Sequence, residues 1–312
     1  MEEKIELVGP VPAPAPTVDK DSGTKKRWRG IAHRFFKNKP AVVAGLVLAV
    51  ILLSAIAAPW VAPHDPTVAV LKDRLKPPAW VDGGSPAHLL GTDQQGRDVL
   101  SRVIWGSRVS LRVGFIVVGI AGVFGIVMGL LAGYFGGRTD FLIMRLVDIQ
   151  FSFPGLLIAL VFVMVLGPGE RNLIIALAFN GWMVHARMAR GLVMTLRDGP
   201  MVEAAKSTGA GTSRILFRHL LPNILSPLLT LFVLEVARII QAEASLSFLG
   251  YGIQPPRASW GLMIGEGRKY ITNASWIVTY PGITIALTVW ALNIISNWLR
   301  SEADPLQKGK RG

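Results

Sequence analysis

The stretch Glu203-Ala204-Ala205-Lys206-Ser207-Thr208-Gly209 forms a polar island between long apolar runs. The turn Asp198-Gly199-Pro200 precedes it, and a helix is expected to start there because proline at a first helical position loses no hydrogen bond. The paired alanines give this helix a surface with little side-chain bulk, which a groove wall can approach closely. Gly209 and Gly211 are expected to end the helix, because glycine adopts positive φ values that other residues avoid.

A second short helix is predicted after the glycines, with Thr212 or Ser213 as its N-cap. Arg214 and Arg218 are four residues apart and share one face of this helix. Pro222 marks the entry to the next apolar run. We therefore expect a compact helix–turn–helix at a membrane surface, shaped to contact another protein.

The composition is typical of a membrane protein. Hydrophobic residues make up 51% of the 312 residues, and the mean hydropathy is +0.45, which is too apolar for an average soluble protein. The formal net charge of +13 comes from basic residues that flank the apolar runs, as cytoplasmic loops of membrane proteins do, so a nucleic-acid partner is not expected. The chain has no cysteine, which excludes disulfides and thiol nucleophiles.

Six apolar runs are long enough to cross a bilayer, which takes about 20 residues. The expected spans lie within 41–63, 113–137, 149–169, 172–196, 222–250 and 270–299. Six crossings place both ends on one side. The basic residues before the first span and in the short loops indicate that this side is the cytoplasm. The sequence thus predicts an all-α integral membrane protein with six transmembrane helices and both termini cytoplasmic.

The segments between the spans complete the predicted organisation. Residues 1–40 form a cytoplasmic tail that ends in a basic segment lying on lipid headgroups, with a nucleic-acid arm as the alternative. Residues 64–112 form an extracytoplasmic loop, and 113–300 form a core with five further spans and a cytoplasmic loop at 198–222. Residues 301–312 form a second cytoplasmic tail.

Two of the connecting segments have a predicted local structure. In the first loop, Thr92 and Gln95 are expected to form a capping box, followed by a short interfacial helix that seats the second span. Ahead of the third span, Arg138, Arg145 and Asp148 are expected to form a short charged turn. Pro154 then kinks or starts the third helix.

One pair of opposite charges falls inside a span. Glu235 and Arg238 are three residues apart and can pair along one helix face, whereas either would be costly alone in lipid. They line the translocation path or a helix interface, or they form a neutralised pair that only fixes packing. Glu243 is expected near the outer end of the same span, where water reaches it.

The sequence lacks the motifs expected of an ATP-binding protein, a serine hydrolase or a metalloenzyme. The chain has no Gly-x-x-x-x-Gly-Lys-Ser/Thr, so ATP binding through a phosphate loop is not expected. It also lacks Gly-x-Ser-x-Gly, the nucleophile elbow of serine hydrolases. The five histidines are scattered along the sequence, which argues against a metal centre. The chain is predicted to be neither an enzyme nor the carrier of a cofactor.

The polar island resembles the EAA loop of ABC importer permeases, through Glu203-Ala204-Ala205, Gly209 and Leu221-Pro222. His219 and Asn223 look like the dipeptide, oligopeptide and nickel branch, although the broader pattern prefers an aliphatic residue in place of His219. Three further stretches are similar to that branch: Leu90–Arg102, with Gly-Thr-Asp-x-x-Gly-Arg-Asp-Val-Leu-Ser-Arg, Glu243–Gly252, and Pro255–Gly261.

The resemblance implies a type I ABC importer permease in the cytoplasmic membrane of a prokaryote. Its partners would be a second, homologous permease, two ATPase subunits that carry ATP and Mg²⁺, and an extracytoplasmic solute-binding protein. In the family, Glu203 would make polar contact in the ATPase groove, and Ala204 and Ala205 would permit close approach. Gly209 would set the turn, and Leu221-Pro222 would anchor the loop, which also contains Arg214 and His219.

The alternative is a stand-alone secondary transporter or channel. Such a protein needs coupling-ion or filter residues at mid-membrane, and only Glu235 and Arg238 qualify. The sequence leaves the substrate open among dipeptides, longer peptides, nickel chelates and other small solutes.

Overall fold

The computed structural model describes residue 30 and residues 32–303, and the chain divides into two units, 1–39 and 40–312. In the first unit, residues 32–37 are helical. The second unit is built from helices, and the only β feature of the described residues is an isolated bridge between Thr92 and Asp98. The predicted all-α fold is confirmed, while part of the predicted basic segment before the first span and most of the last tail lie outside the described residues.

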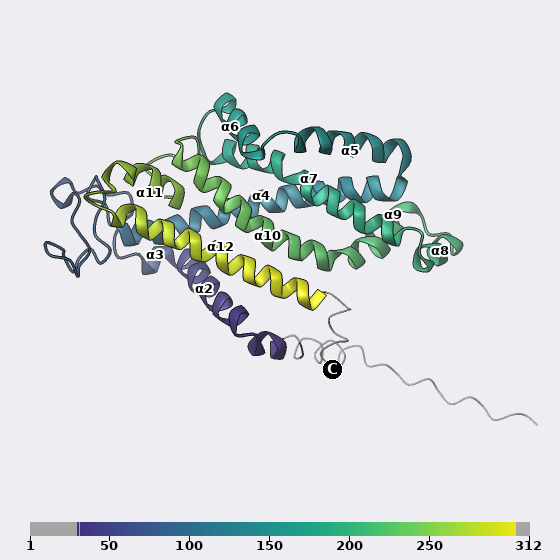
Figure 1. Cartoon of the computed structure of the whole chain (residues 1–312), viewed down its shortest axis with the longest axis horizontal. Helices are drawn as coiled ribbons and strands as arrows, with labels where there is room; N and C mark the ends of the chain where they lie inside the picture. The colour runs from purple at the N-terminus through teal and green to yellow at the C-terminus, as the bar shows by residue number, and fades with distance from the viewer. Residues whose placement is uncertain (1–29, 31, 304–312) are drawn as a thin grey trace, which may run out of the picture. The chain divides into compact units, whose positions relative to one another are not determined.

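The second unit contains four long helices that run beside one another, α4, α7, α10 and α12, with short helices at both ends (Figure 1). The helices are α2 Lys39–Ile56, α3 Ala58–Val61, α4 Val99–Phe135, α5 Gly137–Phe151, α6 Gly155–Leu166, α7 Glu170–Leu196, α8 Pro200–Ser207, α9 Thr212–Arg214, α10 Leu221–Phe248, α11 Trp260–Gly267 and α12 Trp276–Ala303. A π-helical segment, Ile215–Leu220, joins α9 to α10.

The described residues hold four helical segments long and apolar enough to cross a membrane: Lys39–Ile56, Val99–Phe135, Thr212–Phe248 and Trp276–Glu302. Helices α5 and α6 meet at an angle of 87° and together make a fifth candidate. Helix α7 has 27 residues but carries several charges. The multi-pass prediction is confirmed at the level of four to five apolar spans.

The predicted charged turn before the third span is wrong. Arg138, Arg145 and Asp148 lie on α5, a helix of 15 residues that ends where Pro154 becomes the N-cap of α6. A run without proline from 137 to 151 lets the helix form, and its charges are partly neutralised by α7, because Arg187 NH2 lies 2.6 Å from Asp148 Oδ1. The sequence predicts that Pro154 either kinks or starts a helix, and the structure shows that it starts one.

The predicted capping box is also wrong. The hydroxyl of Thr92 accepts a hydrogen bond from the Lys76 amide at 2.8 Å, and the N-cap of α4 is Asp98, whose Oδ2 accepts from the Ser101 amide at 2.8 Å. The expected interfacial helix is not separate, because no proline interrupts 99–135 and its turns continue into the second span as one helix of 37 residues.

Helices α4 and α7 pack closely through a stripe of glycines on α4. A Cβ on Gly125 would lie 2.2 Å from the carbonyl oxygen of Trp182, and one on Gly129 would lie 2.4 Å from that of Ala186. Gly133 follows four residues later, and small residues at this spacing let membrane helices approach to backbone contact. The α4–α7 pair extends along the length of the helix bundle (Figure 1).

Candidate functional site

The loop between α7 and α10, residues 198–222, is folded as a compact pair of arms. The first arm is α8, which begins with Pro200 in its first turn, as predicted. Gly209 ends it with a φ of +75°, and the amide of Gly209 donates to the carbonyl of Lys206 at 2.9 Å. The glycine is therefore required by backbone conformation, since side chains rarely adopt this φ.

The second arm is α9 together with the π-helical segment. Its N-cap is Gly211, with a φ of −66°, so the prediction of a cap at Thr212 or Ser213, and of a positive φ at Gly211, is wrong. The arm is seated by apolar side chains that are buried against α4 and α7. The members of this cluster include Val202, Ala205, Ile215, Leu216, Leu220, Leu130, Ala189 and Val193.

Burial separates the two alanines of the loop. Ala205 is 6% exposed and belongs to the apolar cluster beneath the loop, whereas Ala204 and Glu203 are exposed on its outer surface. Thr208 closes α8 by donating its hydroxyl to the carbonyls of Ala204 and Ala205, at 3.1 and 3.0 Å. Only Ala204 of the pair is therefore available to an approaching protein.

The outer surface of the second arm is basic. Gly209, Arg214, Phe217 and Arg218 line a shallow pocket there. His219 is half-buried, and its carbonyl accepts from Asn223 Nδ2 at 2.6 Å. Leu221 and Pro222 form the first turn of α10. The fold thus brings all eight predicted loop residues to one end of the bundle, beside α8 and α9 (Figure 1).

The predicted intramembrane pair is formed. Arg238 Nε donates to Glu235 Oε2 at 2.8 Å, with Glu235 buried and Arg238 41% exposed. Sequence reasoning missed a third polar group, His185 on α7, which is 1% exposed and has Nδ1 3.2 Å from the Gly181 carbonyl. A Cβ added at Gly181 would lie 4.0 Å from Nη2 of Arg238, so this turn of α7 faces the Glu235–Arg238 pair. A lone histidine in an apolar run gave no pattern from which to find it.

Glu243 is not accessible to water as expected. It is fully buried, with Oε2 accepting from the Ser110 hydroxyl at 2.9 Å and Oε1 from the Ser247 hydroxyl at 2.7 Å. These serines lie on α4 and α10, and the Ser247 oxygen also accepts from the amide of Ile253 at 3.1 Å. The carboxyl group therefore joins two helices and the following loop, which sequence spacing along α10 alone does not reveal.

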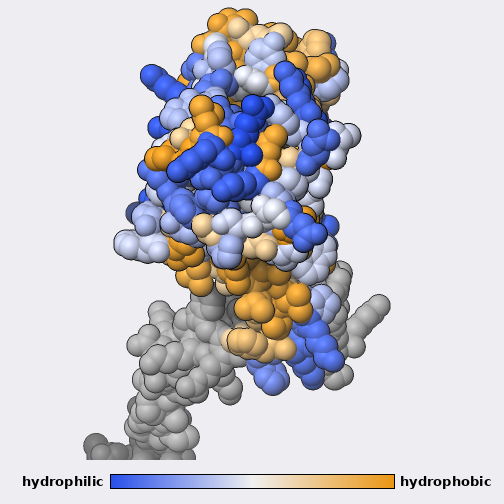
Figure 2. Space-filling view, turned by 90° about the vertical axis from the view of Figure 1, so that its left-hand side faces the viewer, coloured by the Kyte–Doolittle hydropathy of each residue, from blue (hydrophilic) through white to orange (hydrophobic). Residues whose placement is uncertain are grey.

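The opposite end of the bundle is polar as well. Figure 2 views the unit from this end, and hydrophilic residues gather in the middle of the face. Asp93 is buried and accepts from the amide of Arg97 at 3.0 Å and from its Nε at 2.6 Å. Asp93 also binds the Arg102 guanidinium, so one carboxylate holds two arginines at the base of the first loop.

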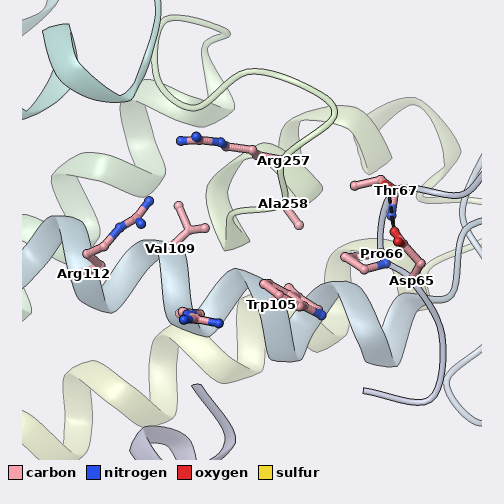
Figure 3. A pocket seen from close by; sticks show the side chains of 9 residues that line it. Asp65, Pro66, Thr67, Trp105, Val109, Arg112, Arg257 and Ala258 are labelled. Carbon is pink, nitrogen blue, oxygen red and sulfur yellow. Dashed lines mark hydrogen bonds between the residues drawn. The ribbon is translucent and has the colours of Figure 1, made fainter. Parts of the chain in front are cut away.

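A pocket of about 450 Å³ opens between α4 and the segments that follow α3 and α10. Figure 3 shows Trp105, Val109 and Arg112 on α4 facing Arg257 across it. Arg108 also lines it, with its guanidinium over the Trp105 ring at 5.5 Å from the centroid.

One carboxylate, Asp65, lines the pocket, and a second, Glu170, binds two of its arginines. Glu170, at the start of α7, pairs with both Arg112 and Arg257 and so ties α4, α7 and the loop after α10 together. A hydrogen bond from the Thr67 hydroxyl lowers the pKa of Asp65 below its ordinary value, so this carboxylate stays charged. Three arginines against two carboxylates leave the pocket with an excess of positive charge.

Family models match two parts of the chain. One described as "Binding-protein-dependent transport system inner membrane component" matches residues 125–306. Another, described as "N-terminal TM domain of oligopeptide transport permease C", matches residues 26–78. The first covers more than half of the chain, which therefore belongs to the family of binding-protein-dependent transport system inner membrane components.

Relatives match over nearly the whole chain. The di/tripeptide transport system permease protein DppC of Pseudomonas aeruginosa is 42% identical over 297 residues, covering 95% of this chain and 97% of the relative. The dipeptide transport system permease protein DppC of Escherichia coli K12 is 44% identical, covering 88% and 92%. The glutathione transport system permease protein GsiD of Pectobacterium atrosepticum is 38% identical, covering 93% and 95%.

A solved structure supports the same fold. A chain of the MetNI methionine ABC transporter in an inward-facing conformation superposes with a TM-score of 0.54 at 17% identity, covering 65% of this chain and 96% of that chain. At this identity the match concerns the fold alone. Together, this fold, the family and the named relatives show that the chain is a permease subunit of an ABC importer. It is a transport subunit rather than an enzyme. The interpretation as a stand-alone transporter or channel is thereby set aside.

Proposed function

We propose that this permease imports peptides, with dipeptides as the first class to test. The relatives at 42% and 44% identity are named as di/tripeptide and dipeptide permeases, and this is the observation that carries the proposal. A relative at 38% is named for glutathione, itself a small peptide. Longer peptides and nickel chelates are the other candidate substrates. The transport assay described below distinguishes them from dipeptides.

The proposal includes six crossings with both termini in the cytoplasm. Helix α7, with 27 residues, is long enough for a hydrocarbon core of about 30 Å, and the bent pair α5–α6 supplies one further crossing. Arg187 and Arg190, near the end of α7 next to α8, would lie at the inner surface, where basic residues concentrate. This orientation puts residues 198–222 in the cytoplasm and the loop 64–98 outside.

Residues 198–222 then form the coupling loop for an ATPase subunit. We assign the outward surface of Glu203, Ala204, Arg214 and His219 to contact with that subunit. Gly209 shapes the turn, while Leu221 and Pro222 transmit its displacement to α10. Ala205 acts from below, because it packs into the apolar cluster that seats the loop. ATP and Mg²⁺ would bind to two such ATPase subunits, and this chain would carry neither.

The remaining partners belong to the same proposal. A second, homologous permease completes the membrane assembly, and an extracytoplasmic solute-binding protein delivers the cargo. That protein would meet the end of the bundle opposite to the coupling loop. The pocket lined by Arg108, Arg112 and Arg257, which we call the arginine pocket, opens at this end (Figure 3). The membrane would be the cytoplasmic membrane of a prokaryote, since the relatives come from bacteria.

Two matched substitutions test the coupling loop in the complex reconstituted with its ATPase and solute-binding partners. We expect Ala204→Leu to abolish substrate-stimulated ATP hydrolysis and dipeptide uptake, because the added bulk blocks close approach. Ala204→Ser, which keeps a small side chain at the same exposed position, serves as the control and should behave like wild type. Normal uptake by Ala204→Leu would refute the assignment of this surface, and the peptide that stimulates wild type identifies the cargo.

The intramembrane pair has its own test. If Glu235 and Arg238 line the path, Glu235→Gln changes transport while the complex still assembles. If the pair only fixes packing, the same substitution lowers the thermal stability and leaves the uptake rate per assembled complex unchanged. Uptake and stability measured on the same preparation separate the two roles.

A further inference from the structure

Two of the histidines that are scattered in the sequence meet in the fold. His64 lies after α3 and His88 lies before the Leu90–Arg102 stretch, yet their rings are 4.7 Å apart between centroids with an interplanar angle of 35°. Both rings lie beside Asp98, the N-cap of α4. The scatter along the sequence, which argued against a metal centre, therefore does not describe the position of this pair in space.

The three side chains direct their ligand atoms to one point. His88 Nδ1 lies 3.0 Å and His64 Nδ1 lies 3.9 Å from the same oxygen, Asp98 Oδ1. One nitrogen or oxygen of each residue falls within 4.8 Å of the others. Two ligands with metal bonds of about 2.0–2.2 Å lie about 3–3.5 Å apart, so the His88–Asp98 distance already fits. His64, with its side chain 41% exposed, has room to close the remaining gap.

A second layer of contacts orients the cluster. Ser101 donates its amide to Asp98 Oδ2 at 2.8 Å and accepts the amide of His64 on its hydroxyl at 3.0 Å. On the far side of the His88 ring, Nε2 lies 4.0 Å from Asp73 Oδ2. At this distance the carboxylate makes no hydrogen bond to the ring, but its negative charge faces the side of the ring opposite to the proposed ligand atom, where carboxylates commonly support histidine ligands.

We propose that His64, His88 and Asp98 form a binding site for one divalent transition-metal ion, with Zn²⁺ as the representative. Two imidazole nitrogens and one carboxylate suit Zn²⁺, Ni²⁺, Co²⁺ or Cu²⁺, whereas Mg²⁺ and Ca²⁺ require oxygen ligands. Three protein ligands leave a position open to water on the exposed side of His64.

The bound ion would fasten the loop 64–98 to the start of α4. His64 and His88 belong to this loop and Asp98 caps the helix, so a shared ion crosslinks them without a disulfide, which this chain cannot form. The arginine pocket borders the same segment, because Asp65 and Thr67 line it. Metal occupancy would therefore reduce the mobility of one wall of that pocket.

Metal binding is measured on the full-length chain in detergent, with an affinity tag free of histidine. We expect one Zn²⁺ per chain by equilibrium dialysis, and no retention of Mg²⁺ or Ca²⁺ at the same concentration. Replacing Zn²⁺ with Co²⁺ should give visible absorption bands of a low-symmetry site. A stoichiometry well below one, or Co²⁺ spectra identical to those of free ion, would overturn the proposal.

The informative variant is His64→Ala. It removes an exposed ligand and leaves the His88–Asp98 hydrogen bond in place, so folding should be retained. We expect the Zn²⁺ affinity to fall at least about 10- to 100-fold, by comparison with the loss from outer-shell changes. His33→Ala, at an exposed histidine outside the cluster, should bind Zn²⁺ like wild type.

Asp73→Asn keeps all three ligands and removes only the carboxylate behind His88. We expect it to lower the Zn²⁺ affinity less than His64→Ala does, while the Co²⁺ bands persist. If His64→Ala binds Zn²⁺ as tightly as wild type, the cluster is a hydrogen-bonded cap and not a metal site. Peptide uptake is not the readout here, so neither result decides the transport function.

Discussion

Arg102 on α4 and Glu266 on α11 are 164 residues apart in the chain, and their guanidinium NH2 and carboxylate Oε2 meet at 2.8 Å. The same oxygen lies 2.9 Å from Arg97 NH2. Together with Asp93 this makes a network of two carboxylates and two guanidiniums, in which both arginines are almost completely buried. The network joins the first loop to α11 and leaves neither guanidinium without a carboxylate.

The first prediction concerns Asp93. We expect Asp93→Asn to lower the free energy of unfolding by about 3–5 kcal/mol, because removing one partner from a buried ion pair leaves uncompensated charge. Glu266 alone would then face two guanidiniums. Thermal unfolding in detergent measures the loss.

Asp65→Asn is the matched control, since Asp65 is exposed and its hydrogen bonds stay within the turn to Thr67. It should unfold close to the wild-type temperature. Equal behaviour of the two variants would mean that the network adds nothing to stability.

The second prediction concerns the packing of α4 against α7. We expect Gly129→Ala to destabilise the protein by about 1–3 kcal/mol, the usual cost of overpacking, because the new Cβ would lie 2.4 Å from the Ala186 carbonyl oxygen. The helices must separate to admit it. Thermal unfolding of the purified chain provides the measurement.

Gly119→Ala on the same helix has no atom within 4 Å of the new Cβ. It should be neutral or stabilising by up to about 1 kcal/mol, because alanine is the better helix former. The opposite signs of the two substitutions separate packing from helix propensity.

The third prediction concerns the turn at Gly209 in the proposed coupling loop. Gly209 and Gly211 both have open space where a Cβ would be added, but Gly209 has a φ of +75° and Gly211 a φ of −66°. We expect Gly209→Ser to cost about 1–2 kcal/mol of local backbone energy and to reduce stimulated ATP hydrolysis. Gly211→Ser should be tolerated, because serine is a good N-cap. Identical ATPase rates for the two variants would show that the positive φ is unimportant for coupling.

The fourth prediction concerns the buried Glu243. Glu243→Gln keeps the shape and an acceptor for one of the two serine hydroxyls, so we expect a small change in unfolding temperature. Glu243→Ala strands Ser110 and Ser247 without their partner, which costs about 1–3 kcal/mol for each buried group left unsatisfied. Thermal unfolding of both variants measures the two losses of stability, and their ratio is compared. A glutamine variant as unstable as the alanine variant would show that ionic charge, and not hydrogen bonding, holds this junction.

Several features of this protein follow from the sequence by itself. The apolar runs predict the long helices, because a chain in lipid must satisfy its backbone groups within each segment. Local chemistry also determines the turn at Gly209 and the start of α8 at Pro200, since both depend on the φ of one residue. The pairing of Glu235 with Arg238 follows from their spacing on one helix. The family follows from residue patterns within several stretches, each of which can be read locally along the chain.

Only the tertiary structure decided the features that join distant segments. Spacing within one helix does not specify which helices become neighbours. Three features depend on those neighbours: the packing of Ala205 into the core, the burial of Glu243, and the ion pair of Arg102 with Glu266. The same holds for His64 and His88, whose rings come within 4.7 Å of each other between centroids because the first loop folds back on α4. Side-chain pairing across the chain is set by packing, which is a property of the folded helices together.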